Sequence, residues 1–263
     1  MPTFACLAIS HNTEVCPVNL NCVTPKSYDA YSPGAIAGTG VVLQDVIWGN
    51  QRMEPTLLGV RHAAPEGVVK YRVVHQADAG WVRVNLQHLE AWRQRLRQQG
   101  WLGQSADGLS YGNVSQRHPQ RGFVITATQV AHQATLTPAD YVHVTDYDPT
   151  THTLTVVGST CASSEAPTHW AVYQLDPRIQ VVFHIHCPTL WAQLQQQPEI
   201  PCTPPDIPYG TQAMVAAIQH LYPADPLSRN CFVMAGHQDG IVSFGRTAAE
   251  AGQVLFAHAR LGL

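Results

Sequence analysis

The 263-residue sequence predicts an α/β fold in which helices pack in layers on a sheet. From Val68 onward, stretches with helical spacing of apolar residues alternate with short β-prone stretches. Apolar residues make up 45% of the chain, which is enough for a sizeable core. Charged residues make up only 13%, against about 25% in an average globular protein. This balance excludes a highly charged disordered chain.

The first 65 residues differ from the rest of the chain. They are rich in Asn, Pro, Gly and Thr, and short apolar stretches such as Gly40–Leu43 suit strands between turns. We therefore expect an irregular or β-rich N-terminal extension over residues 1–65, of unknown role, followed by one main domain over residues 66–263.

The first helix of the main domain is predicted over Leu86–Gln99. Its apolar side chains recur at helical spacing, and Gly100 ends it; they are Leu86, Leu89, Trp92 and Leu96. The same segment carries Arg93, Arg95 and Arg97. We expect these arginines to form a solvated face, with a phosphate-binding face as the alternative.

The elements that follow are predicted in order along the chain. After a turn-rich stretch at Gly108–Ser115, we expect strands at Phe123–Thr126, Tyr141–Thr145, Thr153–Val157, Gln180–His186, Cys231–Ala235 and Ile241–Phe244. Helices are expected at Ser163–Leu175, Thr211–Leu221 and Thr247–Leu261. Ser163 and Ser164 would cap the first of these helices, and Asp176-Pro177 would end it.

Charge and cysteine content narrow the class of function. Fifteen basic and 18 acidic side chains give a net charge of -3, so no basic footprint for nucleic acid is present. No apolar run approaches the roughly 20 residues that cross a bilayer, and the first ten residues carry no Lys or Arg, against a secretory signal. Seven scattered cysteines without a CxxC pair are typical of reduced thiols. We expect a cytoplasmic protein that acts on a small molecule.

The chain contains 14 histidines, and His184-Ile-His186 is its only His-x-His pair. Residues i and i+2 of a strand point to the same face, so both imidazoles would converge while Ile185 faces the opposite layer. Two imidazoles held by a stiff strand suit zinc. The alternative is a hydrogen-bonded histidine pair at the end of a strand, and the pair by itself does not decide between them.

Six segments, in one order over residues 84–263, resemble the class II aldolase/adducin family of metal-dependent sugar-phosphate lyases and their relatives. They are the helix Leu86–Gly100, the segment Gly108–Arg117 with its Gly-Asn-Val-Ser, the strand Phe123–Thr126 with Leu136-Thr-Pro138, Ala162-Ser-Ser-Glu165 with His169, the strand Val181–Pro188, and the turn Gly236-His237 with Gly240. Together these segments are far more specific than any single motif.

The resemblance implies a three-layer α/β/α sandwich around a mixed sheet, assembled as a homotetramer. It implies a divalent metal, commonly Zn²⁺, held by His184, His186 and His237, with Glu165 as the acid/base carboxylate. Adducin itself resembles a branch that kept the fold and lost the metal ligands, so a non-catalytic binding or scaffold protein is the alternative of another class. The presence of all four residues disfavours that alternative.

The resemblance also implies an anion pocket at Gly112, Asn113, Thr128, Ser163 and Ser164. The family's Thr-Gly turn here reads Thr128-Gln129, so a side chain replaces a glycine. That side chain either fills part of the pocket or forces another backbone geometry. The substrate is then unphosphorylated, or it is anchored by another group. For the two serines, simple helix capping is the alternative.

The implied reaction is retro-aldol cleavage of a small hydroxylated keto compound or sugar phosphate through a metal-stabilised enediolate, with epimerisation or dehydration as alternatives. An aldolase mechanism through a lysine Schiff base is disfavoured, because Lys26 and Lys70 are the chain's only lysines and both precede the matching segments. Asp239 is an extra polar group near the expected metal. Tyr209 is a candidate second acid by proximity alone, and packing is the alternative.

Overall fold

A computed structural model describes residues 67–76, 84–158, 160–222 and 225–261, together with two short strands at 47–48 and 51–52. The chain divides into two units. The smaller, Val18–Ala63, contains β1 (Ile47–Trp48) and β2 (Gln51–Arg52), which pair antiparallel. Apart from these strands, the extension expected over residues 1–65 lies outside the described residues. The division of the chain after residue 65 stays a prediction.

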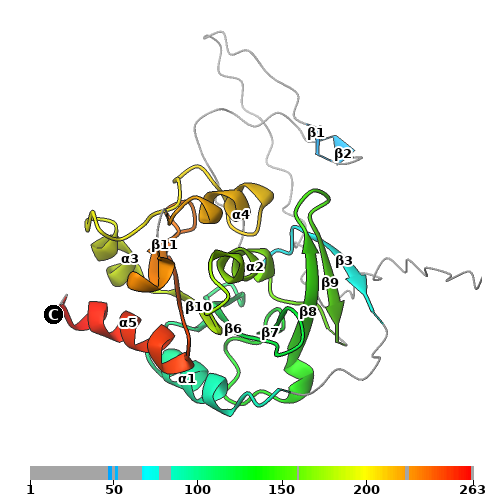
Figure 1. Ribbon diagram of the computed structural model, residues 1–263, viewed down its shortest axis with the longest axis horizontal. Coiled ribbons are helices and arrows are strands. Elements are labelled where there is room, and N and C mark those ends of the chain that lie inside the picture. The colour runs from blue at the N-terminus through cyan, green and yellow to red at the C-terminus, as the bar shows by residue number, and fades with distance from the viewer. Residues whose placement is uncertain are drawn as a thin grey trace, which may run out of the picture. The chain divides into compact units, whose positions relative to one another are not determined.

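The larger unit contains all the other described elements (Figure 1). Its helices are α1 (Gln87–Gln98), α2 (Ala166–Leu175), α3 (Pro188–Leu194), α4 (Gln212–Gln219) and α5 (Ala248–Leu261). Its strands are β3 (Arg72–His75), β4 (Gly103–Gln104), β5 (Ser110–Tyr111), β6 (Asn113–Arg117), β7 (Phe123–Thr126), β8 (Tyr141–Asp148), β9 (Thr153–Val157), β10 (Val181–His186), β11 (Cys231–Val233) and β12 (Gly240–Gly245).

Eight strands form one mixed sheet in the order β11-β12-β10-β6-β7-β8-β9-β3. All neighbours pair antiparallel except β9 and β3, which are parallel. The register sets Phe183 opposite both Ser243 of β12 and Val114 of β6. Strands β10 and β6 therefore lie at the centre of the sheet, where the chain positions its chemistry-bearing residues.

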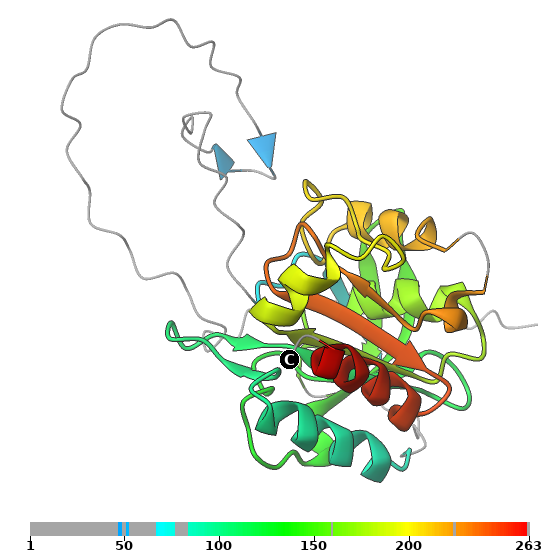
Figure 2. The same ribbon diagram turned by 90° about the vertical axis from the view of Figure 1, so that its left-hand side faces the viewer.

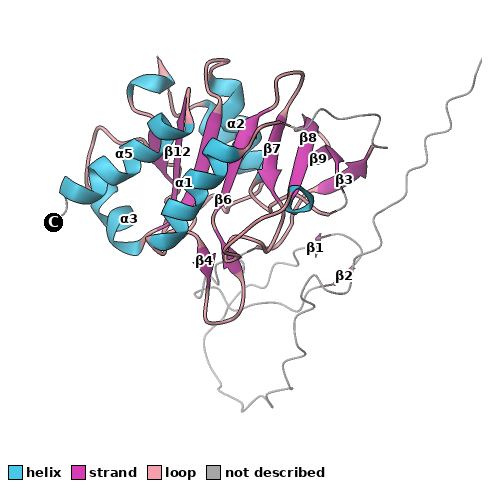
Figure 3. Ribbon diagram, turned by 90° about the horizontal axis from the view of Figure 1, so that it is seen from below, coloured by secondary structure: helices cyan, strands magenta, loops and turns pink. Residues whose placement is uncertain are grey.

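Helices cover both faces of this sheet and make three layers (Figures 2 and 3). On one face, α1, α3 and α5 pack on a core that includes Phe183 and Ile185 of β10. On the other face, α2 and α4 pack on a core that includes Val182. Successive residues of β10 thus alternate between the two cores, as the pleat of a strand requires. The expected three-layer α/β/α fold around a mixed sheet is confirmed.

Sequence patterns located most of these elements to within a few residues, with several differences, of which β4 (Gly103–Gln104), a short strand that was not expected, is one. The stretch expected as turns at Gly108–Ser115 contains β5 and the start of β6, a central strand. Helix α3 was not expected. The serine cap of α2 is wrong: Glu165 occupies the N-cap position and its side chain makes no capping hydrogen bond. The Ser163 hydroxyl accepts only a long bond of 3.4 Å from the Glu165 N–H.

The expectation of a solvated arginine face on α1 is wrong for Arg93. Its side chain is fully buried and forms an ion pair of 2.6 Å with Glu90. It also donates to the carbonyl oxygens of Gln133 and Ala134, at 2.9 and 3.1 Å. Arg93 therefore fixes the loop after β7. None of the helices in the described part of the chain combines the length and apolar character needed to cross a bilayer.

Candidate active site

Strand β10 presents His184 and His186 on the face of the sheet that α2 and α4 cover, while Ile185 packs in the core of the opposite face. Their Nε2 atoms lie 3.2 Å apart. His184 Nδ1 lies 3.3 Å from the carbonyl oxygen of Ile241, to which it can donate. That contact favours the tautomer with a lone pair on Nε2, the atom that faces His186.

The third imidazole, His237, comes from the turn between β11 and β12. The His237 N–H donates to the Met234 carbonyl, and the Gly240 N–H donates to the His237 carbonyl, both at 3.0 Å. A Cβ on Gly240 would lie 3.2 Å from both His184 Cε1 and His237 Cγ. A glycine here lets the two rings approach, with centroids 5.1 Å apart. Gln238 and Asp239, which separate His237 from Gly240, do not displace His237 from the pair on β10.

The three histidines fit a divalent metal by the arrangement of their donor atoms. One ligand atom from each lies within 4.8 Å of the others, and no other group of three or more potential ligands forms among the described residues. Nitrogens at 2.0–2.1 Å from a tetrahedral zinc are separated by roughly 3.3 Å. The 3.2 Å between the Nε2 atoms of β10 is close to that value. Asp239 is not part of this group.

Glu165 is a fully buried carboxylate directly before α2, and its Oε1 lies 3.3 Å from His237 Nδ1. Burial raises the pKa of Glu165, but His237 and His184 lower it more, and the resulting pKa is about 2. The carboxylate is therefore ionised at neutral pH. Within the described part of the protein, neither of its oxygens accepts a well-formed hydrogen bond. A buried charge without such bonds is costly unless a cation or ligand compensates it.

Behind Glu165, His169 is buried on the next turn of α2, and its Nδ1 is 2.7 Å from the Ser115 hydroxyl. Burial lowers the pKa of His169 to about 3, so the ring is neutral. Sequence reasoning gave His169 no role beyond marking the helix. The structure places it within the electrostatic reach of Glu165.

Tyr209 packs its ring flat against His237, with centroids 4.5 Å apart. Only 3% of Tyr209 is exposed, and its hydroxyl accepts a 3.2 Å bond from the Val68 N–H. Lys70 Nζ lies 3.4 Å from the centre of the same ring and donates to the Tyr209 carbonyl at 2.8 Å. The structure thus packs Tyr209 against His237, and its role as a second acid stays a prediction. Lys70, set aside in the sequence, reaches this region through Tyr209.

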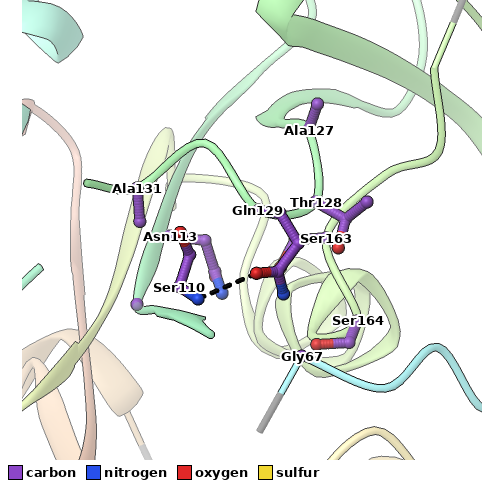
Figure 4. Close-up of a pocket in the computed structure, with 10 residues that line it drawn as sticks. Gly67, Ser110, Asn113, Ala127, Thr128, Gln129, Ala131, Ser163 and Ser164 are labelled. Carbon is purple, nitrogen blue, oxygen red and sulfur yellow. Dashed lines mark hydrogen bonds between the residues drawn. The ribbon is translucent and has the colours of Figure 1, made fainter. Parts of the chain in front are cut away.

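The residues expected to bind an anion line one small pocket (Figure 4). Ser163 and Ser164 directly precede Glu165, and Asn113 lies opposite His184 in the pairing of β6 and β10. A Cβ on Gly112 would lie 3.0 Å from the His184 carbonyl, so a glycine allows this close approach. The pocket therefore adjoins the histidine cluster. The full lining is Gly67, Ser110, Gly112, Asn113, Ala127, Thr128, Gln129, Ala131, Ser163 and Ser164.

Comparison with solved structures agrees with this architecture. A sugar-phosphate aldolase from Thermotoga maritima is 16% identical, with a TM-score of 0.51 over 66% of this chain and 90% of that chain. YgbL from Klebsiella pneumoniae, provisionally described as an aldolase/epimerase/decarboxylase, is 23% identical, with a TM-score of 0.50 over 65% of this chain and 84% of that chain. At these identities the likeness shows the fold.

Comparison with curated protein sequences gives no significant match. Comparison with family models gives a match to the class II aldolase and adducin N-terminal domain over residues 88–261. The match spans most of the chain and includes the three clustered histidines and Glu165. The protein belongs to the class II aldolase and adducin family.

Proposed function

We propose that the protein is a divalent-metal-dependent lyase that cleaves a small hydroxylated keto compound by a retro-aldol reaction. The observation that carries this proposal is the convergence of His184, His186 and His237 beside the buried carboxylate of Glu165. Membership of the family supports a lyase, and metal dependence is typical of its enzymes. We assign His184, His186 and His237 as ligands of a divalent ion such as Zn²⁺.

A divalent ion held by the three histidines would supply positive charge to stabilise the negative charge that develops on a substrate oxygen. Glu165 is ionised and close to the ligand set, so it is positioned to accept the proton of the substrate hydroxyl group. After cleavage to an aldehyde and an enediolate, the same carboxyl group returns that proton to the enediolate carbon. Glu165 alone therefore removes the proton and returns it.

Two other activities are supported by specific observations. The aldolase/epimerase/decarboxylase description of YgbL supports an epimerase on the same constellation, and dehydration uses the same charge stabilisation. Adducin shares the family, which supports a non-catalytic scaffold. The intact set of three imidazoles and one carboxylate favours the enzyme over the scaffold.

Metal analysis and one isosteric substitution test the proposal. The purified chain should contain about one equivalent of divalent metal, or take it up on titration with Zn²⁺. With a panel of keto compounds, Glu165→Gln should retain the metal and lower kcat by about 10²–10⁴-fold. Glu199→Gln, on an exposed residue, is the matched control. Full turnover by Glu165→Gln would refute its acid/base role, and absence of metal uptake would favour the scaffold.

We also propose a homotetramer located in the cytoplasm, as the family resemblance and the scattered cysteines favour. Light scattering on the purified full-length chain gives the number of subunits. A monomer at micromolar concentration would contradict the tetramer.

A further inference from the structure

The pocket beside the histidine cluster is suited to one end of a substrate. Two of its lining residues, Ser163 and Ser164, directly precede Glu165. A third, Asn113, lies opposite His184 in the pairing of β6 and β10. Only 5% of Asn113 is exposed, and its Oδ1 accepts no hydrogen bond from the described part of the protein. Together with the serine hydroxyls, this oxygen gives the pocket a polar lining.

Gln129 places its own side chain in this pocket. Figure 4 shows the Gln129 amide lying between Ser110 and Asn113 on one side and Ser163 and Ser164 on the other. The remaining cavity is about 10 Å³, which is enough for a single water. A phosphoryl group, with three oxygens around phosphorus, does not fit into this space.

The backbone and hydrogen bonds of Gln129 hold the side chain in this position. Its φ of 61° lies in the left-handed region that favours glycine, so the chain keeps a glycine-like turn despite the side chain. Gln129 Oε1 accepts a 2.8 Å bond from the Ser110 N–H, which occupies a donor otherwise available to an anion. Its Nε2 lies against Gly67, where an added Cβ would be only 2.1 Å away.

The described lining of the pocket also provides no compensating positive charge. None of the ten lining residues is Lys, Arg or His. His132, which bonds to the Ser110 hydroxyl at 2.6 Å, is not part of the lining. Phosphate sites typically rely on charge-assisted bonds from cationic side chains or on several free backbone N–H groups.

We propose that Gln129 determines substrate specificity by occupying the pocket and excluding phosphorylated substrates. The substrate is then a keto compound whose end near Ser163 and Asn113 carries an uncharged hydroxyl group. This inference rests on the proposed function for its kinetic consequence. The closure of the pocket to phosphate does not depend on which reaction the protein catalyses.

The test compares the wild-type chain with Gln129→Gly, which removes the side chain and suits the positive φ. Calorimetric titration with inorganic phosphate is performed on the metal-loaded protein and again after chelation, which separates pocket binding from binding to metal. We expect Gln129→Gly to bind phosphate at least about tenfold more tightly than wild type, with or without metal. Gln129→Met, which keeps a side chain of similar length in the pocket, is the matched control and should bind phosphate as weakly as wild type.

The second readout is the ratio of kcat/KM for a keto compound and its phosphate ester. Gln129→Gly should shift this ratio at least about tenfold toward the ester. Gln129→Asn, which tolerates the left-handed backbone, serves if the glycine variant does not fold. Phosphate binding by wild type as tight as by Gln129→Gly would overturn the inference. If no variant turns over any substrate, the proposed function fails, and the phosphate titration still decides the role of Gln129.

Discussion

The buried guanidinium of Arg93 gives a sharp test of what fixes the loop beside the candidate site. Its side chain is completely buried, and it bonds to Glu90 through two nitrogens at 2.6 and 2.7 Å. Two further bonds reach the carbonyl oxygens of Gln133 and Ala134, in the loop that also carries Gln129. The substitution Arg93→Met keeps most of the side-chain volume and removes all four bonds.

The expected cost follows from the environment of each group that is left behind. Removing one member of a buried ion pair costs about 3–5 kcal/mol. The Glu90 side chain is 21% exposed and keeps a 2.8 Å bond from the Tyr141 hydroxyl, which places the value at the low end. We expect Arg93→Met to lower the free energy of unfolding by about 3 kcal/mol. In a domain of this size, that corresponds to a Tm lower by roughly 6–12 °C.

Urea denaturation followed by tryptophan fluorescence measures this difference, with Arg95→Met as the matched control. Arg95 is exposed on the same helix, and its guanidinium lies 4.9 Å from the Trp92 ring. The control should cost about 1 kcal/mol or less. Equal losses in the two variants would refute the reasoning, because burial and the loop contacts would then contribute nothing.

The pH dependence of the same pair has a defined sign. Burial raises the pKa of Glu90, but Arg93 and Tyr141 lower it more, so the folded-state pKa lies below 4.5. Stability from this carboxylate is therefore complete above the pKa of the unfolded state and is lost as the pH falls through the folded-state pKa. The difference between wild type and Arg93→Met should narrow as the pH falls below about 4. A difference that stayed constant to pH 3 would contradict the ion pair.

Three other results are expected. Gly112→Ala should lower the free energy of unfolding by more than about 2 kcal/mol in thermal melts, because its Cβ would lie 2.4 Å from a leucine methyl carbon. The control Gly100→Ala, whose Cβ would have no atom within 4 Å, should cost about 1 kcal/mol. Tyr209→Leu should weaken Zn²⁺ binding about tenfold in competition titrations by releasing the His237 ring, and Tyr209→Phe should not. Chelation should lower the Tm of the wild-type protein reversibly. It should leave the Tm of the His186→Ala variant unchanged.

The central part of the fold could be predicted because its elements follow simple periodicities. Strand β10 is a run of apolar and histidine residues. Because side chains of a strand alternate between its two faces, the sequence alone predicts that His184 and His186 lie on the same face. His237 lies far along the chain, and no local spacing links it to this pair. Its assignment to the cluster needed the resemblance to a family, and the structure brings its ring to 4.7 Å from that of His186.

Strand β6 could not be predicted from periodicity, because its sequence Asn-Val-Ser-Gln-Arg does not look like a central strand. Ser115 is buried and Arg117 is half-buried, and both bond to partners from distant parts of the chain. The Ser115 hydroxyl lies 2.8 Å from that of Tyr173, and Arg117 donates to the carbonyls of Tyr173 and Ile179. Such bonds allow polar residues in a core, but they follow from the tertiary structure and leave no mark in the local sequence.

Gln129 shows how far the sequence alone could go at the pocket. The replacement of glycine left two outcomes open, a filled pocket or a changed backbone. The structure has a filled pocket with the glycine-like backbone retained, at a φ of 61°. That outcome depends on Ser110 and Gly67, which receive the two ends of the Gln129 amide. Neither contact follows from the turn itself.

The segment Gly67–Tyr71 links these observations, since it lies before the family match at residue 88 and still contacts three parts of the candidate site. Gly67 lies against the Gln129 amide, and Lys70 lies on the Tyr209 ring that supports His237. The Tyr71 hydroxyl donates to the carbonyls of Ala162 and Ser163, at 2.8 and 3.1 Å, on the approach to Glu165. A site defined by the family segment alone would therefore lack Gly67, which lines the pocket and lies against the Gln129 amide. The specificity that we infer for this chain depends on residues outside that segment as well as on Gln129 within it.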